Sequence, residues 1–250
     1  MKALGKLNFR DLGGIAAPGG KMRHGLVYRS EGPASFNELH HAELADLGIR
    51  LVCDLRSEEE QRTKPNDWAE QARFLSLDVL ADLRNKQNGG WEKLMENPTV
   101  QGAREAMIYN YQVIPAALQP HLREFTDLLV GGTLPALIHC AAGKDRTGVL
   151  VALLLRMINA QEADIMHDYM QSARFGQNPA NLDIIRGGFQ RRLGFEPADE
   201  VLMPIIGVEP DYLAAAFEAI DELSGSLEAY FAGAGIDDAK RDALARLLLE

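Results

Sequence analysis

A short loop between a predicted strand and a predicted helix constrains this chain most. Residues 139–148 read His-Cys-Ala-Ala-Gly-Lys-Asp-Arg-Thr-Gly. An apolar run at 134–138 precedes the loop and is typical of a buried strand, and residues 146–158 have the pattern of a core helix. A loop that turns from a strand into a helix converges its backbone N–H groups at the helix start. The sequence therefore predicts an anion site at the carboxyl end of a strand, where open α/β sheets bind their ligands.

The loop contains the reactive side chains that are needed for nucleophilic attack on phosphorus. We predict Cys140 as the nucleophile, because positive potential in the loop favours its thiolate. Arg146 is always charged and can hold two phosphate oxygens through its planar fork, so we predict it as the phosphate clamp. Asp145 is the nearest carboxylic acid and is the predicted general acid. Together they predict hydrolysis of phosphomonoesters through a phosphocysteine intermediate.

The other loop residues support this chemistry. Thr147 is expected to donate its hydroxyl to the Cys140 sulfur, and His139 to hydrogen-bond the loop backbone rather than react. The glycines allow the chain to bend and to approach a ligand closely. No metal-ligand spacing occurs in the sequence, and the predicted reaction needs no cofactor. The residues predicted to bind phosphate through the loop are Ala141, Ala142, Gly143, Thr147 and Gly148.

Several alternatives stay open at this point. Asp78 and Asp82 follow a predicted strand and compete with Asp145 as the general acid. Cys53 is either a small core residue or, if its strand lies next to that of Cys140, a redox partner. Two other functions use a similar loop: recognition of a phosphate group without turnover, and the cysteine chemistry of a sulfurtransferase or arsenate reductase.

Charged residues outside the loop have two possible roles. Asp54 and Arg56 are expected to form a structural ion pair. Arg10 and Asp11 either brace the loop or contact the substrate, and the sequence does not separate these roles.

Composition and charge narrow the class of protein further. A chain of 250 residues that is 46% hydrophobic can bury one large core, so we predict a single domain over residues 1–250. A net charge of −10 argues against a nucleic-acid partner, because phosphate backbones are bound by broad basic surfaces. The chain has two cysteines and no disulfide framework. It shows no secretory signal and no apolar run long enough for stable membrane insertion, so we predict a cytoplasmic protein. The oligomeric state stays open.

Apolar periodicity and turn residues predict the order of elements. Strands are expected at 26–28, 49–55 and 73–79, with a helix at 36–47, and a short helix near Trp91. Residues 101–130 have a helical pattern interrupted at Pro115, and 162–175 are helical. Later helices are expected to break at Pro179, Gly187-Gly188, Pro197, Pro204 and Pro210. We predict a helical lid within 180–232, and a core-facing stripe at Leu213, Phe217, Ile220 and Leu223.

The loop and several other stretches resemble a known family. The sequence is similar to the bacterial cysteine-dependent tyrosine and dual-specificity phosphatases related to mycobacterial protein tyrosine phosphatase B. The similar stretches are 8–14, 28–30, 48–50, 54–57, 139–148, 212–213, 225–227 and 235–236.

The resemblance implies a fold and a set of roles. It implies a central, mostly parallel sheet flanked by helices, with a helical lid. It also implies Cys140 as nucleophile, Arg146 as clamp and Asp145 as an acid within the loop. Lys144 matches an extra basic residue shared with phosphoinositide phosphatases, which implies substrate binding by this residue. The implied substrates are phosphotyrosine and, more broadly, phosphoserine, phosphothreonine and phosphoinositides. Ala141 and Ala142 replace a bulkier residue of some relatives and alter the expected pocket depth.

Overall fold

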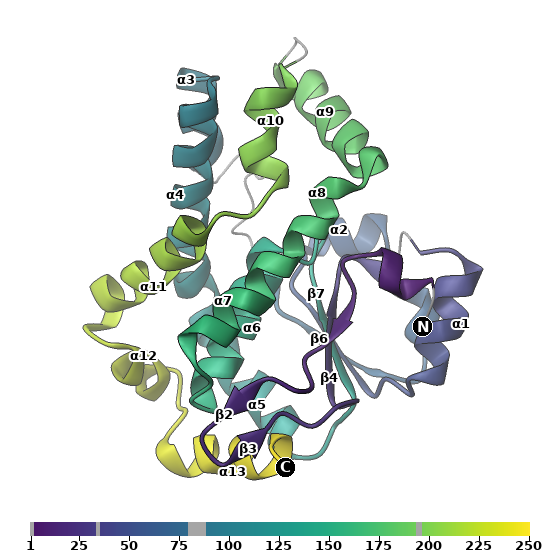
Figure 1. Ribbon diagram of the computed structural model, residues 1–250, viewed down its shortest axis with the longest axis vertical. Coiled ribbons are helices and arrows are strands. Elements are labelled where there is room, and N and C mark those ends of the chain that lie inside the picture. The colour runs from purple at the N-terminus through teal and green to yellow at the C-terminus, as the bar shows by residue number, and fades with distance from the viewer. Residues whose placement is uncertain (1–2, 34–35, 80–88, 194–196) are drawn as a thin grey trace.

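The computed structural model describes residues 3–33, 36–79, 89–193 and 197–250. A sheet with the strand order β1-β4-β7-β5-β6 lies at its centre (Figure 1). β1 is antiparallel to β4, and every other neighbouring pair in this sheet is parallel. The strands are β1 (Arg10–Asp11), β4 (Val27–Ser30), β5 (Leu51–Asp54), β6 (Arg73–Ser76) and β7 (Ala136–His139), with β2 (Ala16–Ala17) and β3 (Gly20–Lys21) forming a separate pair.

Helices make up most of the remaining chain. Those before the loop are α1 (Glu38–Asp46), α2 (Glu58–Thr63), α3 (Gly89–Glu96), α4 (Val100–Leu118) and α5 (Leu122–Val130). Those after it are α6 (Asp145–Met157), α7 (Glu162–Met170), α8 (Arg174–Gln177), α9 (Pro179–Leu193), α10 (Asp199–Ile206), α11 (Pro210–Ser224), α12 (Leu227–Gly233) and α13 (Asp238–Leu248). Within the described residues, no helix is long and apolar enough to cross a bilayer.

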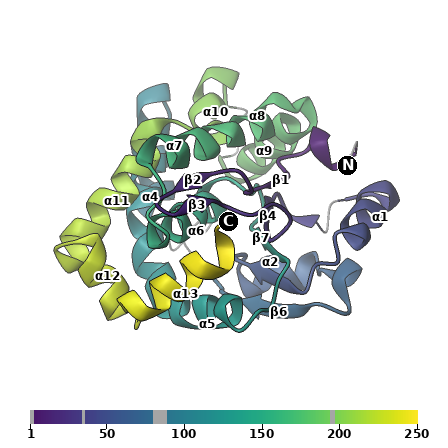
Figure 2. The ribbon, with the colours of Figure 1, turned by 60° about the horizontal axis from the view of Figure 1, so that its bottom comes forward.

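The two faces of the sheet are covered by different layers. Successive side chains of a strand point to opposite faces. Ala136 and Ile138 of β7 therefore enter a large core with residues of α4, α5 and α6, whereas Leu137 enters a smaller cluster with Leu44 of α1. Figures 1 and 2 both show α1 on one side of the sheet and α4 and α6 on the other. All four residues of β4, of β5 and of β7 are buried, as expected for parallel strands covered on both faces. This architecture confirms the predicted fold class.

The sheet register brings three strand ends together at the loop. His139, the last residue of β7, is in register with Ser30 at the end of β4 and with Asp54 at the end of β5. Because these strands are parallel, their carboxyl ends lie at one edge of the sheet. The loop that joins β7 to α6 starts from the middle of this edge.

Three of the predicted helix breaks are wrong. Pro115 lies inside α4, and the chain turns only at the 3-10 segment Gln119–His121. Gly187 and Gly188 lie within α9, and Pro204 lies within α10. A proline inside a helix removes one backbone hydrogen bond. Both prolines are buried among apolar neighbours, and this burial offsets the loss.

The predicted lid region divides into two parts. α11 belongs to the core, because Leu213 and Ile220 are buried, although Leu223 at the end of the predicted apolar stripe is 51% exposed. α9 and α10 extend beyond the sheet, beside α3 and the first half of α4 in Figure 1. Phe189 of α9 packs against Trp91 of α3, with ring centroids 5.4 Å apart. A mobile lid stays a prediction, and α9 and α10 are its candidates.

Candidate active site

Three carbonyl groups of the loop between β7 and α6 accept hydrogen bonds from buried donors outside the loop. The amide of Asn8 donates to the carbonyl oxygens of Ala142 (2.9 Å) and Gly143 (3.1 Å). Gly32 N donates to the carbonyl of Ala141 at 2.9 Å. In a planar trans peptide the C=O and the following N–H point in opposite directions. Holding these carbonyls on the outside therefore turns the next N–H groups toward the inside of the loop, where they form an anion-binding nest.

The thiol of Cys140 lies in this nest. Its Sγ accepts a hydrogen bond from the backbone N–H of Gly143 at 3.2 Å, and the residue is buried. This N–H donor and the N-terminus of α6 place positive potential beside the sulfur. The strand-to-helix turn predicted from the sequence therefore places the thiol at the point where the loop amides converge.

Gly143 is the residue on which the loop geometry depends most. Its φ is +65°, and a Cβ atom at this position would lie 2.1 Å from the carbonyl oxygen of Ser30. We expect Gly143→Ala to lower the free energy of unfolding by about 2–4 kcal/mol, because it adds both backbone strain and a clash with β4. Chemical denaturation checks this result. Gly132→Ala, which also has a positive φ but an open Cβ position, is the control for strain alone.

Arg146 is held by a carboxylate and by two carbonyl groups. Its Nη1 donates to Glu60 Oε2 at 2.8 Å and its Nη2 to Glu60 Oε1 at 3.2 Å, a two-pronged contact with α2. Nη1 also donates to the carbonyls of Leu55 (3.2 Å) and Val79 (3.3 Å). The guanidinium is thereby fixed in one orientation at the end of the loop opposite Cys140. Such pre-organisation suits the binding of a phosphate group.

Asp145 is positioned by two tyrosines that the sequence analysis missed. Tyr111 of α4 donates its hydroxyl to Asp145 Oδ1 at 2.7 Å, and Tyr169 of α7 donates to the Tyr111 oxygen at 2.8 Å. Burial, and next the charge of Asp145, raise the pKa of Tyr111 well above its ordinary value, so this phenol stays protonated and can only donate to the carboxylate. No local pattern reveals this chain of hydrogen bonds, because its members come from three helices.

Lys144 uses its ammonium group on the protein itself. Nζ donates to the carbonyls of Ile205 (2.7 Å) and Gly207 (2.8 Å) at the end of α10, and it lies 3.0 Å from Asp145 Oδ1. These contacts occupy the three protons of the ammonium. The side chain therefore joins the loop to α10 in this structure, whereas the resemblance implied a substrate-binding role.

A buried network supports the loop from behind. Arg29 Nη2 donates to the Gly143 carbonyl at 2.9 Å, and its Nη1 pairs with Asp168 of α7 at 2.6 Å. Arg10 pairs with the other oxygen of Asp168 at 2.7 Å and also donates to Asn8 Oδ1 at 2.8 Å. Burial alone would raise the pKa of Asp168, but the two arginines outweigh it and lower that pKa, so the carboxylate stays charged. Arg10 thus braces the loop through Asn8 and Asp168, which is one of the two roles left open by the sequence.

Comparison with known proteins shows the family of this chain. Residues 1–250 match the model of the tyrosine phosphatase family. The chain belongs to this family. It is therefore a phosphoric monoester hydrolase of the protein-tyrosine-phosphatase type, and neither the sulfurtransferase nor the binding-only alternative is favoured.

Individual relatives of this phosphatase cover most of its length. The triple specificity protein phosphatase PtpB of Mycobacterium tuberculosis is 31% identical over 274 residues, covering 98% of this chain and 97% of the relative. A second relative, from Cupriavidus necator, is named as a candidate tyrosine-protein phosphatase. It is 30% identical over 229 residues, covering 89% of this chain and 79% of the relative. The crystal structure of Pseudomonas aeruginosa TpbA in complex with phosphotyrosine aligns with a TM-score of 0.33 and 17% identity, covering 68% of this chain and 86% of that one.

His139 of this phosphatase lies beside the loop backbone. Its Nδ1 lies 3.2 Å from the carbonyl oxygen of Cys140, and its Nε2 lies 3.2 Å from the Asn66 amide. Burial lowers the pKa of His139, so the imidazole is neutral at physiological pH. Asp54 and Arg56 form the expected ion pair at 2.7 Å. Burial opposes the charge of Asp54, but the hydrogen bonds and the charge of Arg56 outweigh it and lower the pKa of this carboxyl group.

The expected bond from Thr147 to the Cys140 sulfur is absent from the structure. Thr147 Oγ1 is fully buried and has no hydrogen-bond partner among the described residues. Thr147 lies in the first turn of α6, at one end of the loop. Cys140 lies at the other end, directly after β7. A buried hydroxyl without a partner is costly and marks a place where a ligand or water supplies the missing bond.

The rival acid Asp78 and the second cysteine make contacts outside the loop. Asp78 Oδ1 accepts the backbone N–H of Glu58 at 3.0 Å and so caps α2. Asp82 lies outside the described residues. Cys53 sits on β5 in register with Ile138 of the neighbouring β7, so its strand does adjoin that of Cys140. Burial raises the pKa of the Cys53 thiol, which makes it a poor nucleophile. A redox role for Cys53 stays a prediction.

Proposed function

We propose that this phosphatase hydrolyses phosphotyrosine in proteins, with Cys140 as nucleophile, Arg146 as phosphate clamp and Asp145 as general acid. One observation carries the proposal: the Cys140 thiol accepts the Gly143 N–H at the centre of a loop whose carbonyls are held outward. Such a loop offers N–H donors to three equatorial phosphate oxygens at once. Glu60 keeps the Arg146 guanidinium oriented for the same oxygens.

The reaction divides into two displacements at phosphorus. In the first, the Cys140 thiolate attacks the phosphorus atom, the ester P–O bond breaks, and Asp145 gives its proton to the departing oxygen. In the second, Asp145 takes a proton from water, the water oxygen attacks phosphorus, and the P–S bond breaks to restore the thiolate. Inorganic phosphate then leaves, and the enzyme returns to its starting protonation state. The loop amides and Arg146 stabilise the charge on phosphorus in both steps.

The contacts of Lys144 favour phosphotyrosine over phosphoinositides as the first substrate. An inositol phosphate with several phosphate groups needs further cationic partners beside the loop. The ammonium of Lys144 is already bound to α10 carbonyls and to Asp145. The relative from Mycobacterium tuberculosis is described as having triple specificity. Phosphoserine, phosphothreonine and phosphoinositides are therefore proposed as secondary substrates.

A direct comparison of substrates tests the proposal. Phosphate release is measured with a phosphotyrosyl peptide, the matched phosphoseryl peptide and a short-chain, water-soluble phosphoinositide. We expect the phosphotyrosyl peptide to have the highest kcat/KM. Faster hydrolysis of the phosphoinositide would overturn the proposed preference, and hydrolysis of none of the three would overturn the function itself.

Asp145 and Tyr111 are expected to act together on the leaving group. Asp145→Asn should lower kcat for an alkyl phosphate by about 100- to 10,000-fold, and less for para-nitrophenyl phosphate, which needs little protonation. Tyr111→Phe removes only the donor that orients Asp145, so we expect a smaller loss, of about 10-fold, that also depends on the leaving group. The ratio of kcat values on the two substrates is the measurement.

One matched variant makes this test specific. Asp78→Asn is the control for Asp145→Asn, because Asp78 caps α2 instead of contacting the loop. An equal loss on both substrates in Tyr111→Phe would indicate general destabilisation and contradict a positioning role. A larger leaving-group effect in Asp78→Asn than in Asp145→Asn would reassign the general acid.

A further inference from the structure

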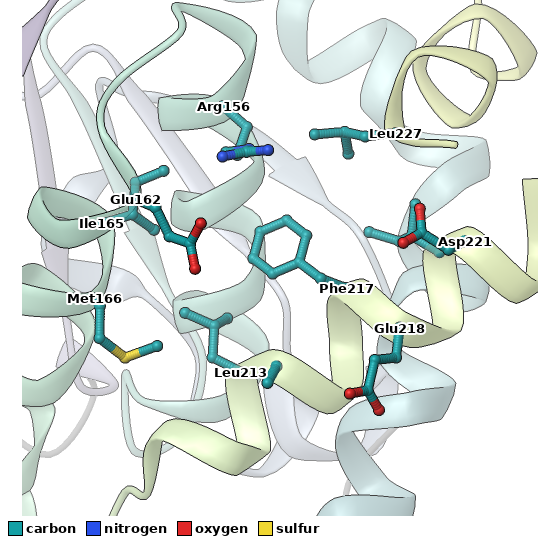
Figure 3. Close-up of a pocket in the computed structure, with 11 residues that line it drawn as sticks. Arg156, Glu162, Ile165, Met166, Leu213, Phe217, Glu218, Asp221 and Leu227 are labelled. Atoms are coloured by element: carbon teal, nitrogen blue, oxygen red, sulfur yellow. The ribbon is translucent and has the colours of Figure 1, made fainter. Parts of the chain in front are cut away.

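A second cavity lies away from the loop, between α6, α7 and α11 (Figure 3). Its volume is about 300 Å³, at the small end of the range for sites that bind small molecules. Arg156 belongs to its wall and follows Asp145 along α6, which at helical rise places it about 16 Å from the loop. We call this cavity the α6–α11 pocket. Nothing in the proposed reaction uses it.

The interior of the α6–α11 pocket is apolar. Phe217 of α11 projects toward α6 and α7, with Leu213 beside it and Ile165 and Met166 opposite (Figure 3). Leu213 and Ile165 are buried, whereas Met166 and Phe217 are only partly covered. The guanidinium of Arg156 lies 5.8 Å from the centroid of the Phe217 ring. An aromatic ring with neighbouring aliphatic groups is the usual lining for an apolar ligand body.

The edge of the α6–α11 pocket is acidic. Phe217 lies between Glu162 and Asp221 in Figure 3, and Glu218 also belongs to the lining. Arg156 is the one cation of the lining against these three carboxylates, which gives it a net charge of −2. None of the three carboxylates forms an ion pair or a side-chain hydrogen bond with the part of the chain that the structure describes, and all three residues are exposed. Unpaired carboxylates beside an apolar wall attract a cation.

We propose that the α6–α11 pocket binds a small organic cation with an apolar body, such as an arylalkyl amine. The apolar body packs against Phe217, Leu213 and Met166. The ammonium group lies at the acidic edge, where the Glu162 and Asp221 carboxylates attract it. The acidic edge repels phosphate esters, so the pocket is separate from the site for the phosphorylated substrate. This proposal does not depend on the proposed phosphatase reaction.

Met166 provides a direct signal for binding. The protein is labelled with ¹³C-methyl methionine, and the Met166 resonance is assigned from its loss in Met166→Leu. Three ligands that share one apolar body are titrated: 4-phenylbutylamine, 4-phenylbutan-1-ol and 4-phenylbutyrate. We expect the amine to shift the Met166 methyl resonance at the lowest concentration, the alcohol to bind about fivefold more weakly and the carboxylate more weakly again.

Charge-neutral variants separate the acidic edge from the apolar wall. The double variant Glu162→Gln and Asp221→Asn should weaken the amine about fivefold and leave the alcohol unchanged. Phe217→Ala should weaken all three ligands. Glu222→Gln is the matched control, because Glu222 lies on α11 outside the pocket lining and is also exposed.

Three results would overturn the proposal. Equal affinity for all three ligands would show that charge plays no part. Tightest binding of the carboxylate would make Arg156 the dominant partner and the site an anion site. Absence of any Met166 shift at millimolar ligand, with the other methionine resonances of the folded protein intact, would show that the pocket binds none of them.

Discussion

Cys140→Ser is expected to lower kcat for para-nitrophenyl phosphate by about 10,000-fold or more. A serine hydroxyl in the same position keeps the hydrogen bond from Gly143 but is not ionised there, so the nucleophile is lost while the loop remains. The phosphate-binding part of the site is intact, and the variant should still bind a phosphotyrosyl peptide. Steady-state kinetics and equilibrium binding are the two measurements.

The second cysteine supplies the control for this variant. Cys53→Ala removes a buried thiol on the adjacent strand, so it shows how much activity is lost through packing alone. We expect it to retain kcat within severalfold. Rapid acid quenching of the parent enzyme with a ³²P-labelled substrate should capture a phosphoenzyme that Cys140→Ser lacks. Turnover by the serine variant, with no captured adduct in the parent, would contradict a phosphocysteine intermediate.

Arg146→Lys is expected to lower kcat/KM by about 1,000-fold. Lysine keeps the charge but cannot bind two phosphate oxygens through one planar fork, and it cannot make the paired contact with Glu60. The loss should fall on both kcat and KM, because the guanidinium contacts phosphate oxygens in the bound substrate and in the transition state. Inhibition by vanadate, which mimics the phosphoryl group, should weaken in parallel.

An exposed arginine serves as the comparison. Arg123 on α5 is 72% exposed in its side chain, so Arg123→Lys should leave kcat/KM unchanged. A loss of less than about 10-fold in Arg146→Lys would mean that charge alone is sufficient at this position and that the two-pronged geometry is not used.

The local part of the site could be predicted from the sequence because its chemistry and geometry lie within one continuous stretch. An apolar strand, the residues from His139 to Gly148 and an apolar helix together define where the thiol sits and which groups surround it. The place of the loop at the carboxyl end of a strand follows the same logic, since parallel strands joined through helices end at one edge of the sheet. The predicted breaks at Pro115 and Pro204 were wrong, because tertiary burial outweighed the local preference.

The residues that hold the loop could not be found in this way. Asn8 and Ala142 are separated by 134 positions, and Arg29 and Asp168 by 139. Tyr111 reaches Asp145 only because α4 packs beside α6 in the folded chain. Periodicity and short motifs report contacts between near neighbours along the chain. The buried Arg29 on β4 is one local exception, since an ionised side chain inside a strand needs a partner that its own segment does not contain.

The residues that hold the loop lie far from it along the chain, so activity depends on folding of the whole chain, both during biosynthesis and on denaturation. The segment before β1 and helix α7 must both be in place before the carbonyls of the loop are held. A partly folded chain would therefore carry an ordinary cysteine, with no hydrolytic capacity. Catalytic activity therefore reports complete folding. In a denaturant titration we expect activity to be lost at the same denaturant concentration as the helical structure, or at a lower one.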